Sequence, residues 1–262
     1  NQLIMFAFLI FEVINIGTSV LCSQYLGARM HKNMVQVVGV SLILNLVFGL
    51  FVSAILHYGA TSLLSMMGLR PELMEYGVSY MKIVGAFAFF QAISLTISAS
   101  LRSANKAVYP MMVTVVVNIL NIIGNYSLIF GKFGMPALGV EGAAISTAFA
   151  RGVSMVILFV ILFRKHIPRF PLSYFCPFPF VELKNLLKIG VPSAGENMSY
   201  SFSQVVLTYF INMLGNEALA TRTYVVNIVM FVYLFAIAMA QGGAICIGHL
   251  VGERKIHAAY LL

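Results

Sequence analysis

Residues 118–131 read NILNIIGNYSLIFG, an apolar run that carries three carboxamide side chains. Asn118, Asn121 and Asn125 are spaced i, i+3 and i+7, so a helix places all three on one face. A helix this apolar is typical of a membrane span, in which polar side chains face other helices or a hydrated cavity. The segment therefore predicts an all-α membrane protein whose helices carry polar faces.

The composition of the whole chain supports this class. Of the 262 residues, 60% are hydrophobic and only 9% are charged, and the mean hydropathy is +0.94. A soluble domain carries roughly a quarter charged residues. The net charge is +8, but the Lys and Arg residues lie between apolar runs without interleaved aromatic residues, which excludes a nucleic-acid interface. We expect the lipid bilayer and small organic molecules as partners, and no nucleic acid.

Charges and helix breakers divide the chain into about seven apolar spans, each near the ~20 residues that a helical crossing needs. The longest hinge, residues 164–180, is the only Pro-rich one and is the expected linker between two domains, residues 1–181 and 182–262. The spans are expected at residues 1–26, 36–57, 77–101, 109–130, 140–163, 186–213 and 219–249.

Lys and Arg are unequally distributed between alternate hinges. By the positive-inside rule, the richer side is cytoplasmic. The richer side holds Arg29, Lys32, Arg102, Lys106, Arg164, Lys165, Arg169, Lys184, Lys188, Arg254 and Lys255, and the other holds Arg70, Lys82, Lys132 and Arg222.

Two segments of the chain repeat. Residues 5–29 align without gaps to residues 230–254, at an offset of 230 − 5 = 225 residues. Both copies run toward the same side, so the repeat is parallel, and its period holds about six helices, as in transporters built from two like-oriented halves. The identical pairs include Met5/Met230, Phe6/Phe231, Leu9/Leu234, Gly17/Gly242, Gly27/Gly252 and Arg29/Arg254.

Five spans carry a polar face at helical spacing. Single Ser or Thr residues on such faces commonly join helices, whereas polar faces on several neighbouring helices favour the lining of a hydrated cavity. The faces are Glu12, Asn15, Ser19 and Ser23 in the first span; Gln91, Ser94 and Ser98 in the third; Thr114, Asn118, Asn121 and Asn125 in the fourth; Thr147, Arg151 and Ser154 in the fifth; and Glu196, Tyr200, Ser203 and Gln204 in the sixth.

Three ionisable residues within the spans are candidate functional residues, because a charge at the bilayer centre costs roughly 3 kcal/mol or more. Glu196 follows Pro192, which is expected to break or begin a helix and leave free backbone groups near the carboxylate. Glu196 is therefore the preferred site for a proton or for Na⁺. Two interpretations of Glu12 stay open, a neutral hydrogen-bonded carboxyl and an ion site. Arg151 is expected to pair with one of these acids or with helix-terminal carbonyls.

Enzyme motifs are missing from the sequence. It has no HExxH, no Asp and therefore no aspartyl dyad, and no Gly-rich phosphate loop with a Walker-type Lys. We expect neither an enzyme nor an organic cofactor, and an ion gradient as the energy source.

Motifs along the whole chain resemble the multidrug and toxic compound extrusion (MATE) family of secondary transporters. GTSVLCSQYLGAR (17–29) is similar to the end of that family's second helix, LLKIGVPSAGENM (186–198) to the start of its seventh, and GGAICIGHLVGERK (242–255) to the end of its eighth. The most specific run is NYSLIFG (125–131) followed by PALGVEGAAIST (136–147). The resemblance implies a 6+6 helix transporter with two lobes, of which this chain holds most of the amino-terminal lobe and the first two helices of the carboxy-terminal lobe.

The resemblance also implies candidate site residues. In the proton-coupled branch, an Asn-x-x-x-Asp pair helps form an amino-lobe site; the matching residues are Asn121 and Asn125, so an amide replaces the acid. Thr147 matches a Thr that faces the same cavity. In the sodium-coupled branch, a Glu lies about two turns after the seventh-helix Pro. Tyr200 occupies roughly that place, and Glu196 lies one turn earlier.

The function implied by the resemblance is Na⁺- or H⁺-coupled antiport that exports drugs or other amphipathic, often cationic compounds by alternating access. The transporter would be a monomer in a bacterial or archaeal cytoplasmic membrane. Two alternatives stay open, a lipid-linked saccharide flippase of the same superfamily and a truncated remnant that does not transport. A flippase needs a cavity rich in Arg and Lys, and Arg151 is the only basic residue expected deep in a span. Both ends look cut, so we expect an internal fragment.

Overall fold

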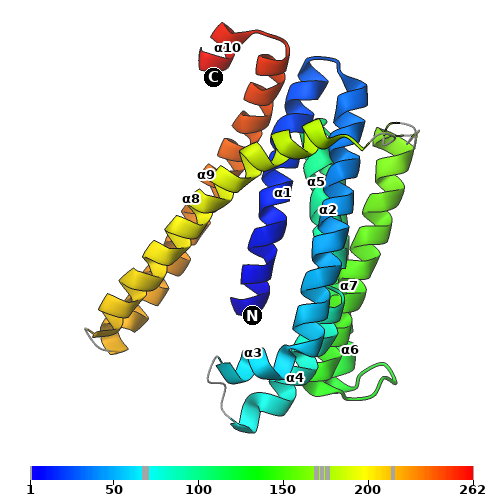
Figure 1. The fold of residues 1–262 in the computed structure, drawn as a ribbon. Coiled ribbons are helices and arrows are strands. Elements are labelled where there is room, and N and C mark those ends of the chain that lie inside the picture. The colour runs from blue at the N-terminus through cyan, green and yellow to red at the C-terminus, as the bar shows by residue number, and fades with distance from the viewer. Residues whose placement is uncertain are drawn as a thin grey trace.

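The computed structural model describes residues 2–66, 71–167, 171, 174, 178–213 and 216–261, and its regular elements are helices (Figure 1). This confirms the expected all-α class. In chain order the helices are α1 (Gln2–Gly27), α2 (His31–Tyr58), α3 (Ala60–Met66), α4 (Pro71–Ala86), α5 (Ala88–Ser103), α6 (Val108–Phe130), α7 (Gly139–Ile161) with a π-helical turn η1 (Leu162–His166), α8 (Phe180–Met213), α9 (Asn216–Gly252) and α10 (Ile256–Leu261).

Each expected span coincides with a helix or with a pair of helices. Among the described residues, four helices are long and apolar enough to cross a membrane, namely α2, α6, α7 with η1, and the part of α9 from Tyr224. The third expected span is not one straight helix, because α4 and α5 meet at 45° and together count as a fifth. The break lies at Phe87, whose φ of −108° and ψ of 20° depart from helical values. Hydropathy carries no information on such a change of backbone angle.

The helices form two groups that are joined at one end (Figure 1). Helices α2 and α4–α7 form one group, while α8 and α9 run alongside each other and diverge from it toward the opposite end. Helix α1 lies between the groups and contacts α2, α5, α8 and α9. A substitution on α1 therefore acts on both groups.

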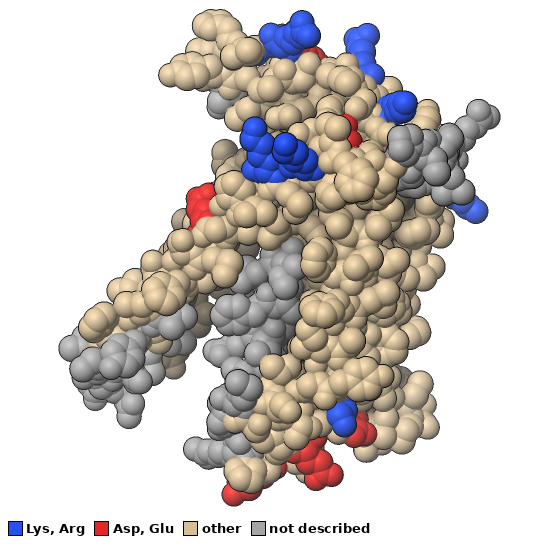
Figure 2. All heavy atoms as spheres, viewed as in Figure 1, with Lys and Arg blue, Asp and Glu red and all other residues tan. Residues whose placement is uncertain are grey.

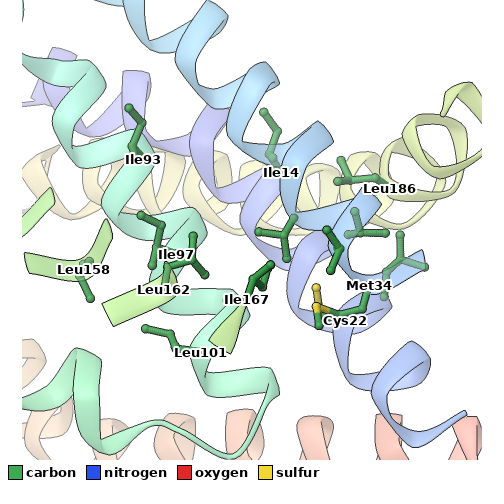
Figure 3. Packing of buried hydrophobic residues seen from close by; sticks show 14 of the residues in the cluster. Ile14, Cys22, Met34, Ile93, Ile97, Leu101, Leu158, Leu162, Ile167 and Leu186 are labelled. Carbon is green, nitrogen blue, oxygen red and sulfur yellow. The ribbon is translucent and has the colours of Figure 1, made fainter. Parts of the chain in front are cut away.

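A buried apolar cluster holds the two groups together (Figure 3). It combines side chains from α1, α2, α5, α7, η1 and α8. Since lipid is as apolar as these side chains, close packing rather than removal from water stabilises such a cluster within a membrane. Its labelled members are Ile14, Cys22, Met34, Ile93, Ile97, Leu101, Leu158, Leu162, Ile167 and Leu186.

Most Lys and Arg side chains visible in this view gather at the joined end of the molecule, whereas Glu side chains are visible at both ends and on the diverging helices (Figure 2). We call the joined end the basic end; it holds the turns after α1, α5, η1 and α9. One contact there is the hydrogen bond from Lys106 Nζ to the Lys165 carbonyl, and another joins His249 Nε2 to the Ser103 carbonyl at 2.7 Å. This is the charge distribution that the positive-inside rule associates with the cytoplasm.

The repeat is visible in the backbone where α1 and α9 end. Arg29 and Arg254 have φ values of 58° and 60°, a left-handed conformation that is uncommon for residues other than Gly. The hydrogen bonds around them also match, at the same offset of 225 residues. Ala28, Arg29 and Met30 donate to the carbonyls of Gln24, Leu26 and Tyr25, and Glu253, Arg254 and Lys255 donate to those of His249, Val251 and Leu250.

The two copies also contact each other through glycines. A Cβ on Gly27 would lie 2.1 Å from the His249 carbonyl oxygen, and a Cβ on Gly252 would lie 2.1 Å from the Gln24 carbonyl oxygen. Because 24 + 225 = 249 and 27 + 225 = 252, the two contacts are equivalent under the repeat. We call this pair of contacts the glycine joint. Close approach of backbones at small residues is a common basis of helix association in membranes.

The start of α8 is held against α1 and α2 by a buried carboxylate. Glu182 is 4% exposed, and it accepts hydrogen bonds from Tyr25 Oη at 2.7 Å and from Asn33 Nδ2 at 2.8 Å. In the segment that precedes α8, the Tyr174 carbonyl accepts a hydrogen bond of 2.8 Å from Gln36 Nε2 on α2. Part of the expected Pro-rich linker, residues 168–170, 172–173 and 175–177, lies outside the described residues.

Candidate functional site

Small residues allow α6 and α7 to pack closely where several of the predicted site residues lie. A Cβ on Gly124 would lie 2.4 Å from Ser146 Oγ, and a Cβ on Gly142 would lie 2.5 Å from the Leu128 carbonyl oxygen. Ser146 Oγ donates to the Asn121 carbonyl at 3.2 Å. The polar face of α6 therefore lies against the polar face of α7, as GxxxG-like packing permits.

Three of the predicted site residues form a hydrogen-bonded chain between these helices. Asn125 Nδ2 donates to Asn121 Oδ1 at 3.0 Å, and Asn121 Nδ2 makes a long hydrogen bond of 3.5 Å to Thr147 Oγ1. Thr147 Oγ1 in turn donates to the Ala143 carbonyl at 2.9 Å. Within the described part of the chain, the buried Asn125 Oδ1 has no hydrogen-bond partner. This series of hydrogen-bonded side chains thus ends at the Asn125 amide oxygen, which can accept a hydrogen bond but cannot carry a titrating proton.

A polar cavity lies beside this chain, between α5, α6 and α7. It has two adjoining parts of about 280 Å³ and about 300 Å³, and Gln91, Thr114 and Ser154 line both. We call them together the amino-lobe cavity. The first part is also lined by Val117, Asn118, Asn121, Thr147, Ala150 and Arg151, and the second by Ser94, Leu95, Ser98, Arg102, Ala107, Pro110, Met111 and Leu158. The polar faces of the third, fourth and fifth expected spans therefore converge on one cavity.

Two arginines are the charged residues that line the cavity, and no carboxylate is among its described lining residues. Arg151 is the predicted one. Arg102 was expected in a cytoplasmic hinge, but it lies in the last turn of α5 and lines the second part of the cavity. A sequence signal for it exists, because Arg102 continues the spacing of Ser94 and Ser98 by one further turn. Arg102 is therefore a second basic residue of the cavity wall, at a helix end, that was not among the predicted site residues.

Glu12 does not line the cavity. It is half-buried on α1, and Arg102 is the cation that attracts it, where the sequence had suggested Arg151. The other polar residues of its face lie at helix interfaces. Ser103 Oγ donates to the Ser19 carbonyl at 3.0 Å, and Asn15 is 5% exposed. The polar face of the first span therefore joins helices.

Glu196 and Tyr200 lie apart from the other predicted site residues. Both are exposed on α8, in the group of helices that diverges from the amino-lobe cavity. The expectation that Pro192 breaks or begins a helix is wrong, because α8 runs without interruption from Phe180 to Met213. A proline within a helix lacks the backbone donor that would bond to the carbonyl four residues earlier, here that of Lys188. Among the described residues, no three His, Cys, Asp or Glu side chains form a metal site.

Comparison with known sequences places the chain among transporters. The MatE family model matches residues 1–127 and 192–261. The chain is 41% identical over 260 residues to the uncharacterized transporter YisQ of Bacillus subtilis, covering 99% of this chain and 57% of that protein. It is 28% identical over 243 residues to the probable multidrug resistance protein NorM of Thermotoga maritima, covering 92% and 52%. The chain thus spans about half the length of the curated relatives it matches.

Solved structures show the same fold. An outward-facing conformation of a multidrug resistance MATE family transporter is 27% identical with a TM-score of 0.86, over 97% of this chain and 57% of that one. An inward-facing conformation of such a transporter is 27% identical with a TM-score of 0.72, over 98% and 59%. The arrangement of helices described here is closer to the outward-facing structure.

Proposed function

The chain belongs to the MATE family, and from this premise we propose that it is part of an exporter of drugs and other amphipathic organic compounds, driven by a Na⁺ or H⁺ gradient. The observation that carries the proposal is the convergence of three polar helix faces on one cavity in a chain whose helices are apolar enough to cross a membrane. The names of the relatives, multidrug resistance proteins among them, support drugs as the class of substrate.

The amino-lobe cavity is the proposed substrate site, with Asn121, Thr147 and Arg151 on its wall and Asn125 behind Asn121. Asn125 cannot carry a proton, so coupling needs an acid elsewhere. Glu12 and Glu196 are the proposed groups, the latter as a site for Na⁺ or a proton beside Tyr200.

Alternating access is the proposed mechanism, between lobes formed by residues 1–181 and residues from 182 onward. The glycine joint closes the basic end, while the helices diverge at the opposite end (Figure 1). If the basic end is cytoplasmic, this conformation opens outward, in keeping with the higher similarity to the outward-facing structure. We propose a monomer in the bacterial or archaeal cytoplasmic membrane, with the bilayer and small organic substrates as partners.

The test uses the full-length transporter in proteoliposomes that are loaded with a fluorescent drug. Imposed Na⁺ or pH gradients should drive efflux of the drug, and Glu12→Gln or Glu196→Gln should reduce the response to one of the gradients. Glu75→Gln, an exposed acid on α4, is the matched control. Absence of gradient-driven efflux from the unmodified transporter would refute the proposed function, and undiminished coupling in both variants would refute the proposed ion sites.

A lipid-linked saccharide flippase is the second candidate function. One observation favours it, because the cavity wall carries Arg102 as well as Arg151, and arginine recognises phosphate well. The discriminating measurement is movement of a fluorescent polyprenyl phosphate between the leaflets of proteoliposomes. Movement of that lipid without drug efflux would favour the flippase.

A further inference from the structure

The amino-lobe cavity has an uneven charge. Arg151 on α7 lines its first part and Arg102 on α5 lines its second part. The other polar lining groups are amides and hydroxyls, and no carboxylate is among the described lining residues. Glu12 attracts Arg102 from α1, but it is not part of the cavity wall. The charged groups on the wall itself are therefore both cationic.

A guanidinium inside a membrane bundle is costly, and such residues commonly mark a pathway or a ligand site. The cost of placing a charge inside the bundle differs between Arg102 and Arg151. Arg102 lies in the last turn of α5, where the negative end of the helix dipole stabilises a cation. Arg151 lies near the middle of α7 and lacks that support, and Asn121 and Thr147 on the same wall are neutral. An organic cation in the cavity would meet repulsion from both arginines without a wall carboxylate to offset it.

An oxyanion would meet complementary groups instead. Arginine donates to carboxylate or phosphate with two parallel N–H groups, and Gln91, Asn118 and Thr114 can donate from neighbouring walls. Apolar side chains complete the site, with Val117 in the first part and Leu95 and Met111 in the second. A few polar groups among apolar walls are typical of a ligand pocket. The combination suits a molecule with an anionic head and an apolar body.

We propose that the amino-lobe cavity binds the oxyanion of an amphipathic compound, held by Arg151 and Arg102. This inference rests on the proposed function only in that it takes the cavity for the transport site. It replaces the often cationic compounds that the resemblance implies with amphipathic compounds that carry a carboxylate or a phosphate.

The experiment measures binding without any gradient, so that its failure is distinct from a failure of export. The full-length transporter in nanodiscs is titrated with 11-(dansylamino)undecanoic acid, with its methyl ester, and with dansylaminoundecyl phosphate. Fluorescence reports the Kd of each. We expect the acid, the phosphate or both to bind about tenfold more tightly than the ester, as loss of a charge-assisted hydrogen bond of roughly 1.5–3 kcal/mol implies. The acid and phosphate arms distinguish the two sources of the oxyanion.

The variants assign the effect to the cavity. Arg151→Gln and Arg102→Gln should each remove most of the preference over the ester, whereas Arg151→Lys keeps the charge and should retain part of it. Arg222→Gln is the control, because this arginine bonds to Gln204 on α8, away from the cavity. Equal binding of acid, phosphate and ester by the unmodified transporter would overturn the proposal, as would no binding or a preference that survives both glutamine variants. None of these results bears on gradient-driven efflux, which tests the proposed function alone.

Discussion

The glycine joint predicts that one added methyl group separates α1 from α9. In Gly252→Ala the new Cβ would start 2.1 Å from the Gln24 carbonyl oxygen, while ordinary contact begins at 3.4 Å, so the backbones must part by about 1.3 Å (3.4 − 2.1). Backbone atoms cannot rotate away as a side chain can. Overpacking of this kind costs roughly 1–3 kcal/mol. Only the conformation in which the glycine joint is closed bears this cost. The ratio of molecules with separated lobes to molecules with a closed joint should therefore rise by about 5- to 150-fold.

Spin labels at His31 and His257, both exposed at the basic end, would report this shift as a longer distance between α2 and α10. Gly27→Ala should give the same result, because its contact is the equivalent one under the repeat. Gly243→Ala is the control. It lies on α9 with no atom of another element within 4 Å of the added Cβ, so the same substitution there adds a methyl group without a contact. A distance distribution for Gly252→Ala that matches the control would refute the reasoning.

Three further predictions concern named hydrogen bonds and contacts. Tyr25→Phe removes one of the two described donors to Glu182, and we expect it to lower the free energy of unfolding by about 1.5–3 kcal/mol, measured by reversible denaturation; an unchanged free energy of unfolding would contradict a stabilising role of this hydrogen bond. Gly124→Val forces α6 away from Ser146 and should lower Tm through a cost of roughly 1–3 kcal/mol, whereas an unchanged Tm would contradict the packing. Asn125→Asp should make efflux depend on pH, because only the protonated acid can still donate to Asn121 Oδ1; activity should fall as the pH rises, and a flat profile would argue against the hydrogen-bonded chain.

Hydrophobic runs and helical spacing were sufficient to predict the all-α class and the convergence of polar faces. Gln91, Thr114 and Ser154 each stood on a predicted face, and each lines both parts of the cavity. Helical spacing predicts these residues correctly because which residues share a face depends on one helix alone. Which faces meet depends on packing, so the sequence did not show that the face containing Asn15 would join helices instead.

The misses share a physical origin. Arg102 was assigned to a hinge because it is charged, although a helix end can hold a cation. Pro192 was expected to break or begin a helix, although α8 continues through it despite the lost backbone donor. Nothing in the sequence indicated that Glu182 would be buried, because its partners Tyr25 and Asn33 lie 157 and 149 residues away in the chain. Each outcome depends on neighbours that local sequence does not reveal.

The contact between Ser23 and Gly248 has a consequence for how the two copies fit together. Since 23 + 225 = 248, these two residues are equivalents that touch each other, which places them on the axis relating the two copies. A Cβ on Gly248 would lie 2.1 Å from Ser23 Oγ and 2.9 Å from Ser23 Cβ, so turning the hydroxyl away would not make room for a second serine. Two identical copies of the first segment, each with a serine here, would therefore clash at this contact. The close contact thus depends on a difference between the two copies, a glycine in one and a serine in the other.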